Sequence, residues 1–152
     1  MSLDVYLTTQ EKRVVNPTSG IFIRSNGETK EISRAEWDEL NPNQEPVMIK
    51  EMLEVETHEV YSRNITHNLG AMAQEAGIYK QLWWPEEVGA KIAKDLIGPL
   101  AVGLSKLKAA PEIFKKHNPD NGWGNYDGLV SFVEDYLSAC EEYPEATIGV
   151  CR

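Results

Sequence analysis

Residues 64–69 (NITHNL) hold the densest group of uncharged hydrogen-bonding side chains in the sequence. On a helix, Asn64, His67 and Asn68 would share one side, at spacings of three and four residues. A solvated face in so acidic a chain would more often carry Glu or Lys, so directional hydrogen bonding explains these residue types better. The alternative is a plain helix start, with Asn64 or Thr66 as the N-cap and His67 a half-buried, satisfied residue.

Residues 118–126 (NPDNGWGNY) form a second candidate segment, in which two glycines flank Trp123. Glycine frees the backbone, so a large flat ring can be set at an angle that other residues would forbid, and it could then stack on a base or sugar. Asn121 adds hydrogen-bonding groups and Tyr126 a second ring. In the alternative interpretation, Trp123 fills the core and Asn125 caps the final helix.

Trp83 and Trp84 lie directly before a proline, and Tyr79 precedes them on the same expected helix end. Adjacent tryptophans point in different directions, so at most one of them can belong to the core. The other is expected at a surface or cleft. Tyr79 and Trp83 are therefore further candidates for ligand contact.

Catalytic templates fit the sequence poorly. It lacks a paired-histidine zinc helix, a phosphate-cradling glycine loop and a Gly-x-Ser-x-Gly elbow. The histidines His58, His67 and His117 are far apart, and only His67 is placed to act as an acid or base, without an identifiable partner. Cys140 and Cys151 lack paired spacing and are expected to be free thiols. We assign no catalytic residue, metal or cofactor, and an enzyme is the less favoured class.

The formal charge is −9, and the basic residues are scattered along the chain. Duplex nucleic acid is disfavoured as a partner, because counterion release needs clustered cations. An anionic membrane surface is disfavoured for the same reason, and no apolar run approaches the roughly 20 residues that span a bilayer. The first residues lack the features of a secretory signal, so the expected location is the cytoplasm.

The elements that must position these residues follow from periodicity and turn signals. We expect extended segments, a hairpin across Asn26-Gly27, a helix with a Ser33/Glu36 capping box, and three later helical segments, the second bent or broken at Gly98-Pro99. The extended segments are 4–9, 20–24, 29–32, 46–49, 53–61 and 147–151, and the later helical segments are 65–76, 85–110 and 129–140.

This order predicts an α+β fold: an antiparallel or mixed sheet of about five strands, covered on one face by about four helices. A chain of 152 residues can bury one sizeable core, so one domain over residues 1–152 is expected. The hairpin and short helix at about 10–50 are expected to form an insertion in it, which could act as a flap over a pocket.

Three motifs resemble a family of small proteins found in phages, prophages and bacterial genomes. They are SLDVYL at residues 2–7, NITHNL at 64–69, and NGWGNY at 121–126, the last followed by the YLSAC helix at 136–140 and a short final strand. The resemblance covers most of the chain except roughly residues 10–50. The family implies no established activity, but its phage context includes counter-defence proteins that sequester nucleotide-derived immune signals in the host cytoplasm.

The leading hypothesis is a binding protein that captures a nucleotide-derived ligand, ADP-ribose-like or a cyclic nucleotide. Asn64, Thr66, Asn68 and Asn121 would supply hydrogen bonds, His67 would contact phosphate or ribose, and Trp123 with Tyr126, Trp83 or Tyr79 would offer rings. Because the chain is acidic, local help from Arg63, Lys80 or Arg152 would be needed.

Two other classes remain open. One is an interaction protein that inhibits a host protein through exposed aromatic side chains and an acidic surface. The other is a hydrolase that uses His67 as a base. A homo-oligomer is compatible with each of them, although no sequence feature specifies one.

Overall fold

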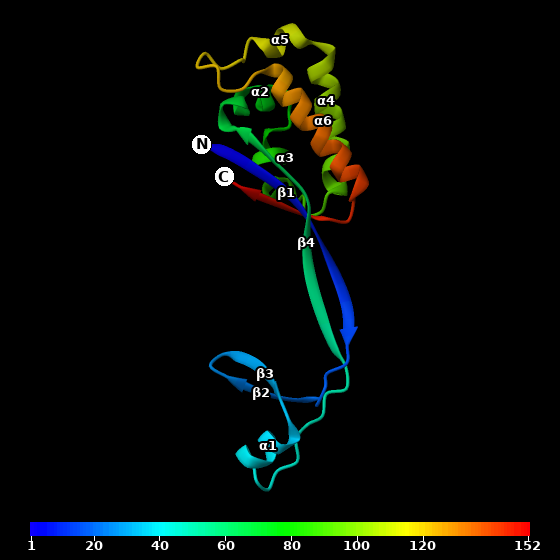
Figure 1. Cartoon of the computed structure of the whole chain (residues 1–152). Helices are drawn as coiled ribbons and strands as arrows, with labels where there is room; N and C mark the ends of the chain where they lie inside the picture. The colour runs from blue at the N-terminus through cyan, green and yellow to red at the C-terminus, as the bar shows by residue number, and fades with distance from the viewer. The chain divides into compact units, whose positions relative to one another are not determined.

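The computed structural model describes all 152 residues, and the chain divides into two compact units (Figure 1). The larger unit comprises Met1–Gln10 and Thr57–Arg152, and the smaller unit comprises Glu11–Glu56. The strands are β1 (Ser2–Val15), β2 (Ile21–Ser25), β3 (Glu28–Ile32), β4 (Met52–Thr66) and β5 (Thr147–Cys151). The helices are α1 (Arg34–Leu40), α2 (Gly70–Glu75), α3 (Tyr79–Trp83), α4 (Lys94–Ala109), α5 (Pro111–Lys115) and α6 (Tyr126–Glu142), with the short 3-10 helices η1 (His67–Leu69) and η2 (Pro85–Val88). The fold is α+β, as predicted.

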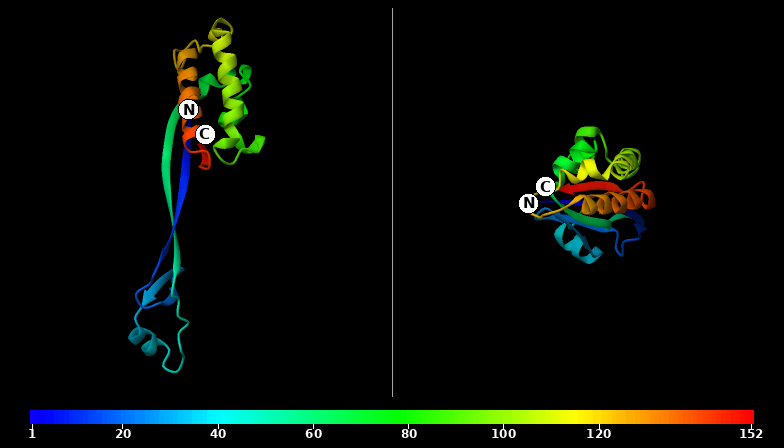
Figure 2. Two further views of the ribbon diagram at one scale, coloured as in Figure 1. Left: turned by 90° about the vertical axis from the view of Figure 1, so that its right-hand side faces the viewer. Right: turned by 90° about the horizontal axis from the view of Figure 1, so that it is seen from above.

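The three-stranded sheet has the order β4-β1-β5, with β1 antiparallel to β5 from Asp4↔Cys151 to Thr8↔Thr147. Successive side chains of a strand point to opposite faces, and Leu3, Val5 and Leu7 are fully buried on one of them. The helices of the larger unit gather on one side of this sheet, and α4 packs along α6 (Figure 2). The first strand therefore lies in the middle of the sheet and at the base of the core.

Two glycines of the larger unit mark close approaches between elements. A Cβ on Gly103 of α4 would overlap the side chain of Ile78, and one on Gly149 of β5 would overlap the ring of Tyr6 on the neighbouring strand. Only a residue without a side chain fits at either position. None of the helices combines the length and the apolar character that crossing a lipid bilayer requires.

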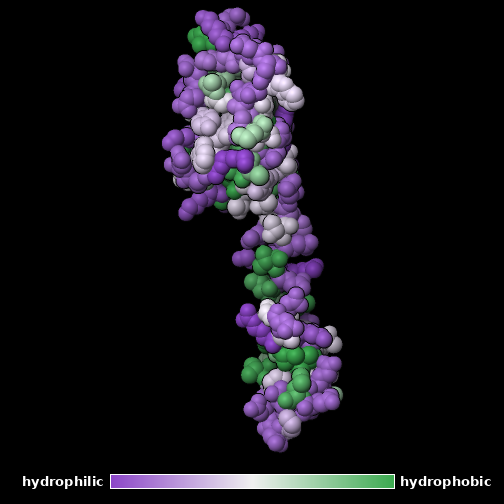
Figure 3. All heavy atoms as spheres, turned by 90° about the vertical axis from the view of Figure 1, so that its left-hand side faces the viewer, coloured by the Kyte–Doolittle hydropathy of each residue, from purple (hydrophilic) through white to green (hydrophobic).

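The smaller unit contains the expected hairpin and capped helix. β2 pairs with β3 across Asn26 (φ 50°) and Gly27 (φ 82°), the two positive angles that a type I′ turn needs. The capping box of α1 is formed between Ser33 and Glu36. The surface of this unit carries many apolar side chains (Figure 3).

The five strands form two sheets, of three and two strands, where a single sheet was expected. The helical segment expected over residues 85–110 is divided into η2 and α4, and Gly89, with positive φ, lies at this division. Gly77, also with positive φ, follows α2 just beyond the helix expected over residues 65–76. Pro99 lies inside α4 without dividing it, so the alternative of two helices separated at Gly98-Pro99 is wrong; the segment is divided after Val88 instead.

The helix expected over residues 65–76 begins later than predicted. β4 continues to Thr66, and only then do η1 and α2 follow. Ile65 and Thr66 are β-branched, and pairing with β1 favours the extended form over the helical one. Asn64 is therefore a strand residue, and the helical spacing proposed for residues 64, 67 and 68 is corrected.

Candidate functional site

The two sequence segments singled out above meet at one cavity of the larger unit. It has a volume of about 710 Å³, within the range of small-molecule pockets. Its lining comes from the start of β1, the end of β4, η1, and the loop before α6. The lining residues are Met1, Ser2, Asn64, Thr66, His67, Asn68, Asn121 and Trp123.

Side-chain amides hold the loop before α6 against η1. The Nδ2 of Asn68 donates to Asn121 Oδ1 (3.5 Å) and to the carbonyl oxygen of Trp123 (3.4 Å). Asn121 Oδ1 also accepts from the Trp123 backbone N–H at 2.9 Å, which fixes the turn. Trp123 itself is 70% exposed, so its ring lies at the rim of the cavity and not in the core.

Gly124 brings the loop backbone into direct contact with the beginning of η1. Its φ is +91°, and a Cβ there would lie 2.7 Å from Thr66 Cγ2 and 2.9 Å from Leu69 Cγ. Gly122 has a similar φ of +74° but open space around it. Gly124 is thus required by packing as well as by its backbone angle, and Gly122 by its backbone angle alone.

His67 is fixed by hydrogen bonds at both ring nitrogens. The indole N–H of Trp83 donates to Nδ1 at 3.2 Å, so Nδ1 carries no proton and Nε2–H donates to the Ser2 carbonyl oxygen at 2.7 Å. Neither nitrogen is left to contact a phosphate or ribose, or to accept a proton from a substrate. His67 instead links α3 to the first strand at the cavity wall. This is close to the alternative interpretation, in which His67 is a half-buried residue whose hydrogen bonds are satisfied within the protein.

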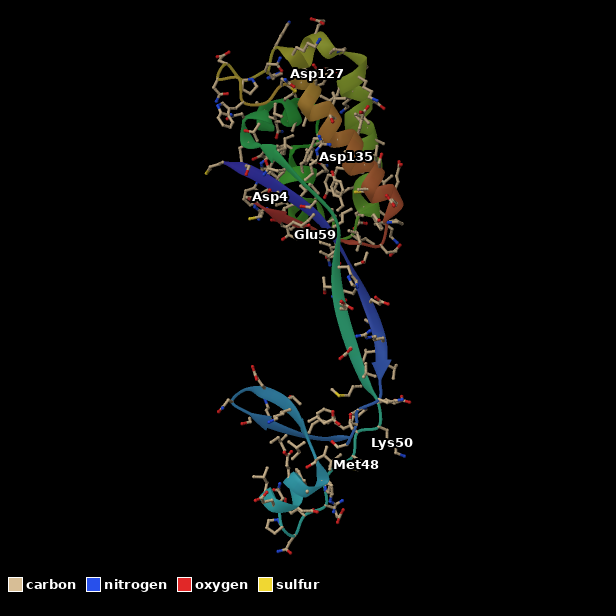
Figure 4. The ribbon with its side chains drawn as sticks, viewed as in Figure 1. Asp4, Met48, Lys50, Glu59, Asp127 and Asp135 are labelled. Carbon is tan, nitrogen blue, oxygen red and sulfur yellow. The ribbon has the colours of Figure 1, made fainter.

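The cavity retains hydrogen-bonding groups that the protein does not use. Asn64 donates its Nδ2 to Asp4 Oδ1 at 2.6 Å, leaving its own Oδ1 as an acceptor; Asp4 is labelled in Figure 4. Asn68 keeps Oδ1 as an acceptor, and Asn121 keeps both Nδ2 protons. The Thr66 oxygen accepts from the Asn68 N–H at 3.3 Å, which leaves the hydroxyl proton to donate. The site therefore offers two acceptors and two donor groups, all uncharged.

The cations expected to assist the site are engaged elsewhere. Arg63, Lys80 and Arg152 each pair with a carboxylate: Asp135 at 3.1 Å, Glu87 at 2.9 Å and Glu86 at 2.7 Å, respectively. The Arg152 guanidinium also lies 3.8 Å from the ring centroid of Trp84. Hydrogen bonds from the backbone N–H of Glu86 and from Arg152 lower the pKa of the Glu86 carboxyl. No Lys or Arg side chain lines the cavity.

Tyr79 and Trp83 lie beside the cavity, at a second and smaller hollow. This hollow, of about 310 Å³, shares His67 with the first one and is also lined by Gly70, Ala71 and Gln74. The Tyr79 and Trp83 rings stack on each other with centroids 5.1 Å apart, and Trp83 is only 1% exposed. Trp84 is 36% exposed, so one tryptophan of the pair is core and the other is surface, as predicted.

Tyr126 borders neither hollow. It is buried, and its hydroxyl donates to the Leu107 carbonyl oxygen at 2.7 Å. The proposal that Tyr126 or Trp83 stacks on a ligand is corrected, because both rings are enclosed by protein. Stacking in the larger cavity would fall to Trp123, since Tyr79 lines only the second hollow. The final helix is capped by Asn125, which accepts from the Gly128 N–H.

Sequence reasoning missed the contribution of the first strand. Ser2 lines the cavity and accepts from His67, and Asp4 orients Asn64. The available signal was the pairing of two strands, since β1 and β4 are neighbours in the sheet. No family model matches the chain, and no curated protein or solved structure is found to be similar to it.

Proposed function

We propose that this protein binds a small ligand through an uncharged, ring-shaped part of it, namely the nucleoside part of a nucleotide-derived molecule. The observation that carries the proposal is the shared cavity lined by Asn64, Thr66, Asn68, Asn121 and Trp123. The proposed role is capture of a nucleotide-derived immune signal, ADP-ribose-like or a cyclic nucleotide.

The pattern of unused groups supports a heterocyclic ligand. The carbonyl oxygens of Asn64 and Asn68 can accept from amino or imino groups, while the Asn121 amide and the Thr66 hydroxyl can donate to ring nitrogens or carbonyls. The exposed ring of Trp123 offers a stacking platform, which contributes about 1–3 kcal/mol per base. A nucleobase presents both of these features.

The uncharged side chains of the lining favour the nucleoside part over the phosphates. A buried or half-buried phosphate would need cations, and no Lys or Arg lines the cavity. Phosphates of a bound ligand would therefore extend into solvent. Because both His67 nitrogens are engaged, binding without turnover is the better-supported outcome.

The test is isothermal titration calorimetry of the purified chain against adenosine, guanosine, cytidine, uridine, ADP-ribose and cyclic nucleotides. Trp123→Ala should weaken the best ligand roughly 5- to 150-fold, from the stacking energy above. Trp84→Ala is the matched control, because Trp84 is also exposed but lies outside the cavity. The affinity of this variant for the best ligand should be unchanged. Absence of binding at high micromolar concentration by folded protein would end the proposal.

The second candidate is a protein that binds a partner protein through Trp123, which is favoured by the 70% exposure of that side chain. The two candidates separate at Asn68, whose amide holds the loop from within the cavity lining. If Asn68→Ala leaves partner capture intact while Trp123→Ala abolishes it, protein recognition is the function. Loss of small-ligand affinity in Asn68→Ala supports the first candidate.

A further inference from the structure

The smaller unit exposes far more apolar side chain than it buries. Its fully buried large apolar residues are Ile21 and Ile32. Eight others are exposed by 37% or more: Val14, Leu40, Val47, Met48, Ile49, Met52, Leu53 and Val55. Two buried side chains contribute roughly 3–6 kcal/mol, which is small against the entropy of ordering this segment. The exposed set must be covered for the unit to gain a substantial core.

Part of the exposed set forms one face of the paired strands β1 and β4. Arg13 and Glu54 form an ion pair at 3.2 Å and so lie on the same face. Since side chains alternate along a strand, Val14, Leu53 and Val55 lie on the opposite face. These three are 64%, 60% and 50% exposed. A two-stranded ribbon with one apolar face in water is marginal without a covering layer.

The segment before β4 adds a second apolar group, and it is held in place. The Ile49 N–H donates to the Gly20 carbonyl oxygen at 2.8 Å, and a Cβ on Gly20 would lie 2.7 Å from the Ile49 carbonyl oxygen. This contact fixes the backbone that carries Val47 and Met48, which are 84% and 54% exposed. Met48 and Lys50 are labelled in Figure 4, and apolar side chains gather on this unit in Figure 3.

We infer that this apolar surface is the interface of a homodimer, in which the same surface of a second copy covers it. The apolar area approaches that of a stable dimer. A fully buried aliphatic side chain corresponds to roughly 60–120 Å² of apolar area. Alternation places Met52 on the face of Arg13 and Glu54, so the other seven side chains, about half exposed, offer roughly 200–400 Å² per copy. A standard interface buries about 800 Å² per partner, of which somewhat more than half, roughly 450 Å², is apolar.

The charges beside the surface also suit a second copy. Lys50 and Glu51 are adjacent within the apolar segment. A two-fold axis can therefore place Lys50 of one copy opposite Glu51 of the other, and Glu51 opposite Lys50. A two-fold interface must be complementary to itself, and a surface of one charge sign would not be. The interface lies entirely in Glu11–Glu56, so it is independent of the ligand cavity.

The test is the molar mass of the full chain by multi-angle light scattering and sedimentation equilibrium, from low to several hundred micromolar. The wild type should approach twice 17.1 kDa. Leu53→Glu and, independently, Val55→Glu should halve that mass, with far-UV circular dichroism confirming that the chain stays folded. Val102→Glu is the matched control, because Val102 is an equally exposed valine (57%) on α4 of the larger unit, and it should stay dimeric.

A wild type that stays at 17.1 kDa at several hundred micromolar overturns the inference and leaves the surface to a different protein. A Leu53→Glu or Val55→Glu chain that is folded and still dimeric overturns it as well. Dissociation of Val102→Glu would move the interface to α4. Because the ligand cavity is elsewhere, ligand affinity should be unchanged in Leu53→Glu, so this result and that of the calorimetry are separate.

Discussion

Replacing Gly124 with alanine should detach the Trp123 loop from η1, whereas the same change at Gly122 should not. Both glycines have positive φ, but only at Gly124 would the new methyl group meet other atoms, at 2.7 Å from Thr66 Cγ2. The pair therefore separates the cost of the backbone angle from the cost of the contact.

The magnitudes follow from these two terms. A left-handed backbone angle costs an alanine roughly 1–2 kcal/mol, and this applies to both variants. Overpacking against Thr66 and Leu69 adds about 1–3 kcal/mol in Gly124→Ala alone. If the loop lifts away instead, the second term is relieved, but the Asn68 amide loses the Trp123 carbonyl and the cavity opens.

The assay combines urea denaturation, followed by far-UV circular dichroism, with calorimetry of the best ligand. Gly122→Ala should lower the free energy of unfolding by about 1–2 kcal/mol and bind ligand normally. Gly124→Ala should lower the free energy of unfolding by roughly 2–5 kcal/mol, or bind at least tenfold more weakly if the loop moves. Equal stability and equal affinity of the two variants would refute the account of how the loop is held.

Four further predictions concern buried positions. Gly103→Ala should lose about 1–3 kcal/mol because its Cβ position is already filled by the side chain of Ile78; equal or higher stability of this variant in urea denaturation contradicts this. Burial raises the pKa of the Cys140 thiol from 9.0 to about 12, so native protein at pH 8 should be alkylated at Cys151 alone, as mass spectrometry can show. Above pH 9 the unfolded chain releases the Cys140 proton while the folded chain keeps it, so the free energy of unfolding should fall between pH 9 and 12. Tyr136→Phe removes a buried hydroxyl without a protein partner and should leave stability unchanged or raise it by about 1–2 kcal/mol; a clear loss in thermal denaturation would argue against this.

Local signals in the sequence predicted several elements well. The Asn26-Gly27 turn and the Ser33/Glu36 capping box appear as expected, because each depends on contacts within a few residues. The boundary between β4 and η1 was predicted wrongly. It depends on pairing with β1, which lies about sixty residues earlier, and periodicity in residues 65–76 alone favours a helix.

The candidate site, too, was predicted in part from the sequence. The polar and aromatic residue types of residues 64–68 and 121–123 were sufficient to select the side chains that line one cavity. Their individual roles were not predictable, because the engagement of His67 depends on Trp83 and Ser2, and the enclosure of Tyr126 depends on α4. Residue type indicates what a group can do, whereas tertiary contacts decide which of its atoms remain available.

The two ends of the smaller unit leave the larger one through neighbouring strands. Gln10 belongs to β1 and Thr57 to β4, and these strands are hydrogen-bonded side by side in opposite directions (Figure 1). A short turn could join the two strands there and keep the sheet of the larger unit intact. Residues Glu11–Glu56 could therefore be removed or exchanged without changing the order of the strands in that sheet. Variation in length at this place would leave the lining of the cavity unchanged, and the proposed dimer surface could be gained or lost in one genetic step.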